Sequence, residues 1–192
     1  MFQWISFLSY IVIMSFTPGP NNIMAMNNAK NVGFRNGLSF CFGGFFGGIV
    51  VMTLSVLFST FLYTFIPKIQ LPMKLFTVAY MVYLILLIIL PSKNNRIKAK
   101  TGNLLMGFLM TVLNPKVILF GITVMSTYIT PYYKEILQIS ILIILLAFIG
   151  FSSMVCWSLF GTIFDKIFTK HKNIINFVMA AMLLYCIITL FL

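Results

Sequence analysis

The sequence TPGPNN at residues 17–22 interrupts a long apolar segment near the start of the chain. Proline has no N–H group and clashes with the carbonyl four residues earlier, so the two prolines free the carbonyls of Met14 and Phe16. One continuous helix over residues 2–29 would be ~42 Å long at ~1.5 Å per residue, whereas a bilayer core is ~30 Å thick. We therefore expect a membrane-spanning helix that is broken near its middle at this motif.

A second break of the same kind is predicted at NPK, where Pro115 follows Pro18 by 97 residues (115 − 18), about half of the chain. Each break interrupts the first apolar segment of its half, and each half then supplies two further segments. Three spans are an odd number, so the second half would enter the membrane in the opposite orientation. Corresponding breaks in inverted halves are where transporters bind their substrates. The chain therefore reads as two pseudo-repeats, about 1–97 and 98–192.

The composition predicts an integral membrane protein. Of 192 residues, 61% are hydrophobic and 8% are charged, whereas soluble domains average ~45–50% and ~25%. Residues 81–90 (MVYLILLIIL) are apolar at every position, which favours helices over the alternating strands of a barrel. At roughly 20 residues per crossing, the fold class is an all-α membrane protein with one domain, 1–192, of six transmembrane helices in two inverted three-helix halves. The expected spans are 2–29 (interrupted), 38–65, 71–91, 104–129 (interrupted), 136–163 and 173–192.

The basic residues are unequally distributed between alternate loops. Loops 30–37, 92–103 and 164–172 hold nine Lys and Arg residues, and loops 66–70 and 130–135 with their flanks hold three. Basic loops stay on the cytoplasmic side, so we expect a multi-pass protein of the cytoplasmic membrane with both termini outside. The net charge of +11 is thereby assigned to loops, which argues against a nucleic-acid partner.

The first break offers both kinds of group that a zwitterion needs. Carbonyls at the end of the first half-helix can accept from an ammonium, and amides that open the second half-helix can donate to a carboxylate. The same motif would also fit a plain kink or a helix that starts at the membrane surface. The candidate substrate-binding residues are Thr17, Pro18, Gly19, Pro20, Asn21 and Asn22.

The second break adds Asn114, Pro115 and Lys116 to the candidate substrate-binding residues, and Pro115 should free the carbonyl of Thr111. Lys116 is the one basic residue that the topology cannot place in a loop. A lysine near mid-membrane costs ~2.5–3.5 kcal/mol, so such residues usually line a cavity. The alternative is a span that begins at Asn114, with Lys116 extending to the membrane surface.

Three further features carry structural expectations. The glycine-rich stretch 43–48 contains two overlapping G-x-x-x-G patterns, typical of close helix packing, or else of a thin wall beside a substrate path. The stretch 33–37 (GFRNG) predicts a turn. Cys41, Cys156 and Cys186 form no Cys-x-x-Cys pair, so we expect buried packing residues with no disulfide, metal site or cofactor.

Together, TPGPNN at 17–22, GFRNG at 33–37, the glycine-rich second span and NPKVILFG at 114–121 resemble the LysE/RhtB family of amino-acid exporters, most closely its cysteine/O-acetylserine branch. The resemblance runs the whole length of the chain. It implies efflux of small amino acids by a protein that is not an enzyme, driven by the proton gradient, with both Pro motifs lining a central site. Many members of the family carry an acid after the glycines of the second span, where this chain has Ile49 and Val50. This departure argues against a cationic substrate and leaves proton coupling without an obvious carboxylate.

The expected partners are the lipid bilayer and a small neutral amino acid such as cysteine or O-acetylserine, and the sequence leaves a homo-oligomer open. Three other functions are open to a membrane protein of this kind. A transmembrane thiol-disulfide carrier would need a cysteine beside each Pro break, where this chain has Gly19, Asn21, Asn114 and Lys116. A membrane scaffold would give paired broken helices no purpose. An uncoupled pore is barely distinguished from an exporter by sequence.

Overall fold

The structure is a computed structural model that describes two continuous ranges, 4–57 and 103–163, and within them every element is a helix. The third and sixth expected spans (71–91 and 173–192) lie largely outside the described residues, as do loops 66–70, 92–102 and 164–172. Single positions in these two spans are described, and all of them are helical: 75, 78, 79, 82, 85, 86, 177, 180, 181, 184, 187 and 188.

The first apolar segment forms two helices, α1 (Trp4–Phe16) and α2 (Pro20–Val32). The α1 hydrogen bonds end as the Thr17 amide donates to the carbonyl of Ile13 at 2.9 Å. Gly19 is extended and precedes a proline at the first position of α2, where a missing N–H costs nothing. The break expected at TPGPNN is confirmed.

The corresponding segment of the second half is also broken, into α6 (Leu104–Val112) and α7 (Pro115–Thr123), with a π-helical turn, η1 (Val124–Ile129), after them. Asn103 and Asn114 cap α6 and α7, since each side-chain oxygen accepts from the backbone N–H two residues later. The two parts meet the length and apolarity of one membrane span and are bent by 58°. The break expected at Pro115 is confirmed.

Two unbroken helices, α3 (Phe34–Leu57) and α8 (Ile136–Ile163), are each long and apolar enough to cross a membrane. With the bent pair, the described residues contain up to three candidate spans. The bounds of α8 match the expected fifth span. The complete set of six helices in two inverted halves stays a prediction.

The expected turn over GFRNG is wrong in its extent, because the turn between α2 and α3 consists of Gly33 alone. Gly33 has φ 84°, a conformation that favours glycine, and α3 begins directly after it rather than at residue 38. Gly37 lies inside α3, where a Cβ would be 3.1 Å from the Cα of Ala29. A glycine there lets the first turn of α3 lie directly against α2.

Glycines also bring α3 and α6 into backbone contact. A Cβ at Gly43 would overlap the carbonyl of Leu104, and one at Gly107 would overlap the carbonyl of Phe40. At Gly47 a Cβ would lie 2.9 Å from the carbonyl oxygen of Phe108. The helix-packing interpretation of the glycine-rich stretch therefore holds for Gly43 and Gly47.

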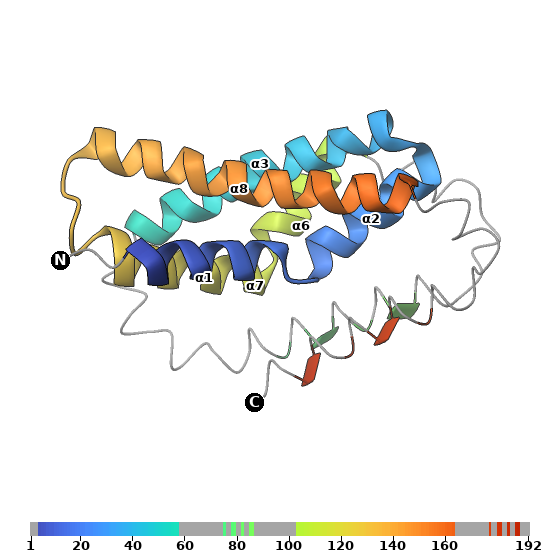
Figure 1. Cartoon of the computed structure of the whole chain (residues 1–192), viewed down its shortest axis with the longest axis horizontal. Helices are drawn as coiled ribbons and strands as arrows, with labels where there is room; N and C mark the ends of the chain where they lie inside the picture. Colours follow the sequence, from blue (N-terminus) through green and yellow to red (C-terminus); the bar gives the residue numbers. More distant parts are fainter. Residues whose placement is uncertain are drawn as a thin grey trace.

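Helix α2 lies in the interior, in contact with α3, α6 and α8 (Figure 1). Its residues are polar compared with those of α1, yet most of them are buried. Helix α1 packs against α8 and, through its side chains, against α7 and η1, with the rings of Tyr10 and Phe120 stacked at 5.9 Å between centroids. The two helix breaks lie next to each other within the described bundle.

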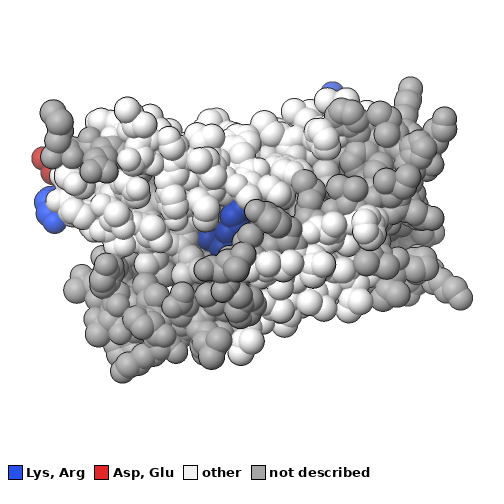
Figure 2. All heavy atoms as spheres, turned by 60° about the horizontal axis from the view of Figure 1, so that its bottom comes forward, with Lys and Arg blue, Asp and Glu red and all other residues white. Residues whose placement is uncertain are grey.

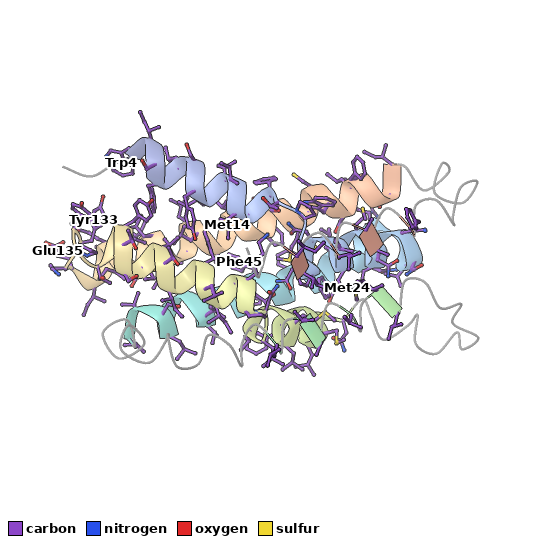
Figure 3. The ribbon with its side chains drawn as sticks, turned by 90° about the horizontal axis from the view of Figure 1, so that it is seen from below. Trp4, Met14, Met24, Phe45, Tyr133 and Glu135 are labelled. Atoms are coloured by element: carbon purple, nitrogen blue, oxygen red, sulfur yellow. The ribbon has the colours of Figure 1, made fainter. Side chains whose placement is uncertain are left out.

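Connections that the expected topology assigns to opposite sides of the membrane lie at opposite ends of the bundle. Trp4, Tyr133 and Glu135 lie together at one end (Figure 3), and α2 meets α3 at the opposite end, where α8 also ends (Figure 1). The first described residues and loop 130–135 therefore share one side, and the turn at Gly33 lies on the other.

The cysteine prediction holds for Cys41, which is buried, and is wrong for Cys156, which is exposed on α8. An apolar segment does not distinguish a side chain facing the bundle from one on its outer surface. Cys186 lies outside the described residues.

Candidate substrate-binding site

The two helix breaks meet at a cavity of about 80 Å³. One water needs roughly 10–15 Å³ of such space, so the cavity has room for a few waters or a small solute. Side chains from both halves of the chain form its wall. The lining residues are Met14, Ser15, Gly19, Asn21, Asn22, Gly44, Gly48, Met52, Thr111, Asn114, Lys116, Val117, Phe120, Leu146, Ala147, Gly150 and Met154.

Most of the residues predicted from the sequence gather at this cavity. Gly19, Asn21, Asn22, Asn114 and Lys116 line it, and Thr17 contributes its carbonyl to Lys116. The three prolines of the motifs are not among the lining residues and act instead by setting where each helix stops and restarts.

A buried hydrogen-bonded network joins the breaks. The Asn114 amide donates to the side-chain oxygen of Asn21 at 2.9 Å, and the Asn21 amide donates to the Thr111 hydroxyl at 2.8 Å. The side-chain oxygen of Asn114 accepts from the backbone N–H of Lys116 at 3.0 Å. Because buried hydrogen-bonded chains polarise one another, the network fixes the two breaks relative to each other.

The carbonyls at the end of α1 are occupied by donors from other elements. Asn22 donates to the carbonyls of Ser15 and Thr17 at 2.8 and 3.1 Å. From α8, Ser153 donates to the Ser15 carbonyl at 2.7 Å and Trp157 to the Phe16 carbonyl at 3.2 Å. The expectation that the Phe16 carbonyl is free for substrate is therefore wrong, because α8 supplies its donor.

Lys116 reaches from the second break to the first. Its ammonium donates to the carbonyl of Thr17 at 3.1 Å, and the side chain is half-buried. A Cβ at Gly19 would lie 3.1 Å from Lys116 Nζ and 3.2 Å from its Cδ. Glycine at position 19 therefore leaves the space that the lysine fills. Figure 2 shows a basic group in a hollow midway along the molecule, away from the charged groups at the edges of the view.

Thr111 contributes differently from what the sequence predicts. Its carbonyl, expected to be free because of Pro115, accepts from the backbone N–H of Asn114 at 3.2 Å. Its hydroxyl instead holds the amide of Asn21. Sequence reasoning also missed Ser153 and Trp157, although two polar-tipped residues one helical turn apart in an apolar segment are a signal that one face of α8 meets polar groups.

The rest of the cavity wall is apolar and uses small residues to make space. Met14 lies near the end of α1, close to the middle of the molecule (Figure 3). Gly44 and Gly48 line the cavity, so the substrate-path interpretation of the glycine-rich stretch fits these two positions. A Cβ at Gly44 would be 2.8 Å from the Met154 sulfur, and one at Gly150 would meet nothing within 4 Å. The cavity thus pairs a polar, cationic end with an apolar wall.

A further polar group lies on α2 beyond the cavity. Asn28 is 0% exposed, and neither polar atom of its side chain has a partner among the described residues. Leaving such a group unsatisfied costs ~1–3 kcal/mol. One turn earlier, the Ala25 carbonyl accepts from Ser158 at 3.2 Å.

Among the described residues that line the cavity, Lys116 is the only charged one. The chain has two acidic residues; Glu135 lies at one end of the bundle (Figure 3), and Asp165 lies outside the described residues. Within the described part of the chain, no three His, Cys, Asp or Glu side chains gather as a metal site. The lining residues therefore offer a solute one cation and several amide and carbonyl groups.

Comparison with known proteins gives a single family. The LysE type translocator family matches residues 12–192. The cysteine/O-acetylserine efflux proteins of Escherichia coli strain K12 and of Shigella flexneri are each 33% identical to the chain over 187 residues, covering 97% of it and 96% of each relative. That of Escherichia coli O1:K1 is 32% identical with the same coverage. No solved structure matches the chain.

Proposed function

Because the chain belongs to the LysE type translocator family, and so is a membrane transporter rather than an enzyme, we propose that it exports a small neutral amino acid such as cysteine or O-acetylserine. The observation that carries the proposal is the cavity between the two helix breaks, with Lys116 at its polar end. The relatives named as cysteine/O-acetylserine efflux proteins, which align over nearly their whole length, support this choice of substrate.

The substrate carboxylate binds Lys116 Nζ and the amides that open α2 near Asn21 and Asn22. A charge-assisted bond to an ammonium and the positive end of a helix both favour an anion at this position. The substrate ammonium binds the carbonyl oxygens of Ser15 and Thr17 at the end of α1, where it replaces the donors from Asn22 and Lys116 that these carbonyls accept in this structure. Each half of the chain thereby supplies contacts to the same molecule.

Selectivity for a small neutral side chain follows from the other wall of the cavity. Met14, Met52, Met154 and Phe120 line the cavity together with Gly44 and Gly48. Polarisable thioethers suit a short apolar or sulfur-containing group. No carboxylate from the described part of the chain lines the cavity to balance a second positive charge, so lysine and arginine are poor substrates.

The protein lies in the cytoplasmic membrane with six helices in two inverted halves and both termini outside, and the proton gradient drives export. The orientation is supported by nine basic residues in loops 30–37, 92–103 and 164–172, against three in loops 66–70 and 130–135 with their flanks. The matching breaks at Pro18 and Pro115, one in each half, support the inverted repeat.

Replacing Lys116 by Met keeps the apolar stem and removes the charge. We expect folding to survive while the apparent affinity for O-acetyl-L-serine falls roughly ten- to hundredfold, since a charge-assisted hydrogen bond contributes ~1.5–3 kcal/mol. Uptake into inside-out vesicles over a range of concentrations measures this. Lys116→Arg should recover only part of the affinity, because a planar fork does not replace a point charge.

The matched control is Lys134→Met. Lys134 also donates to a backbone carbonyl, that of Thr130 at 2.7 Å, but it is exposed at the end of the bundle. This variant should transport as the unaltered protein does. If Lys116→Met transports with unchanged affinity, the lysine is not a substrate contact.

Coupling to protons is tested against the uncoupled pore. Inside-out vesicles with an imposed proton gradient should accumulate O-acetyl-L-serine above its outside concentration, and a protonophore should abolish the accumulation. Rapid equilibration that never exceeds the outside concentration, with or without the gradient, would identify a pore.

The orientation is tested by single cysteines introduced at Asn95 and at Glu135 in a chain whose native cysteines are replaced. In intact cells an impermeant maleimide should label the cysteine at 135 and should reach that at 95 only after the cells are opened. Labelling at 95 in intact cells would reverse the assigned orientation.

A further inference from the structure

Asn28 differs from the other buried asparagines of α2 in its side-chain hydrogen bonds. Asn21 and Asn22 both donate to partners within 3.1 Å. Asn28 is fully buried, yet no residue in the described part of the chain bonds its side-chain nitrogen or oxygen. Buried polar groups are bonded in the large majority of cases, so this one requires a reason.

The helical position of Asn28 relates it to the cavity. Asn28 follows Asn21 by seven residues, nearly two full turns, which puts both residues on one face of α2 about 10.5 Å apart along its axis. Asn21 lines the cavity. Asn28 therefore continues the polar face of α2 from the cavity toward the end of the molecule where Lys30 and Arg35 lie.

The contacts that enclose this part of α2 involve small groups. A Cβ at Gly161 of α8 would be 2.5 Å from the carbonyl oxygen of Met26. On α3, Gly37 lies against Ala29, and Ser158 of α8 donates to a backbone carbonyl of α2. The backbones beside Asn28 therefore meet through small residues, and separation of α2 there also requires the side chains of Met24, Phe40 and Met154, which pack in one buried cluster, to move apart.

We propose that Asn28 is a second binding station for the zwitterionic substrate, occupied when α2 separates from α3 and α8. The station lies between the central cavity and the loop that contains Lys30 and Arg35. An amide side chain donates through nitrogen and accepts through oxygen, so it can bind a carboxylate and an ammonium in turn. In the closed arrangement both capacities are unused. This inference rests on the proposed function, because it requires a zwitterion moving through the protein.

The test compares Asn28→Leu with Asn31→Leu. Both remove an asparagine from α2, but Asn31 is exposed and bonded to Asn27 at 3.3 Å. Binding of O-acetyl-L-serine at equilibrium and its exchange rate in proteoliposomes are measured for each. For Asn28→Leu we expect affinity within about twofold of the unaltered protein and exchange slowed about tenfold, the factor that one lost hydrogen bond can produce. Its thermal unfolding midpoint should be unchanged or higher, since an unsatisfied amide is removed. Asn31→Leu should change neither binding nor exchange.

Two results would overturn the station. One is exchange by Asn28→Leu at the unaltered rate, and the other is a loss of binding affinity as large as the loss of rate, which would make Asn28 a support of the central cavity. Unaltered protein that neither binds nor exchanges O-acetyl-L-serine would overturn the proposed function instead.

If the Asn28→Leu variant does not fold, a second measurement tests the proposal. Asn28→Cys is placed in a chain without the native cysteines and treated with a small hydrophilic thiol reagent. A buried position reacts only if the path opens, so we expect labelling that O-acetyl-L-serine slows. Complete protection under all conditions would overturn the inference.

Discussion

The hydrogen bonds from Asn114 to Asn21 and from Asn21 to Thr111 are the interaction on which the rest of the structure depends. A helix broken inside hydrocarbon exposes backbone groups that lipid cannot satisfy, so irregular backbone survives there only where protein or a cavity covers it. This chain covers each break with the other. The carbonyl of Thr17 accepts from Lys116, and the Asn114 side chain caps α7 while bonding Asn21. Neither break would be stable in lipid without its counterpart.

The glycines serve this pairing in two distinct ways. Gly43 and Gly107 bring α3 and α6 into backbone contact, which holds the second break deep in the bundle. Gly19, Gly44 and Gly150 instead leave space: Gly19 for the Lys116 side chain, Gly44 for that of Met154, and Gly150 for the cavity. Close packing and an internal space thus come from the same residue type, and the distinction depends on which backbone lies opposite each glycine. The result is a cavity that has a cation and amide groups at one end and apolar side chains elsewhere.

The sequence predicts the features that depend on local chemistry. The breaks follow from proline, the bounds of α8 from an uninterrupted apolar segment, and the position of Lys116 on the cavity from the cost of a buried charge. The sequence does not predict features that depend on neighbouring helices. The Phe16 carbonyl was expected to be free, yet Trp157, 141 residues away, donates to it. The role of the Thr111 hydroxyl, the exposure of Cys156 and the single-residue turn at Gly33 likewise depend on which helix faces meet, and local sequence does not contain that information.

The central claim is that the paired breaks bind both charged ends of one amino acid, and an exchange assay in proteoliposomes tests it most directly. Vesicles loaded with labelled L-cysteine would be exposed to L-cysteine, to cysteamine, which lacks the carboxylate, and to N-acetyl-L-cysteine, which lacks the ammonium. The account predicts exchange with L-cysteine and at least about tenfold weaker exchange with either analogue, since each loses charge-assisted bonds of ~1.5–3 kcal/mol. Exchange of cysteamine or N-acetyl-L-cysteine as effective as that of L-cysteine would contradict it.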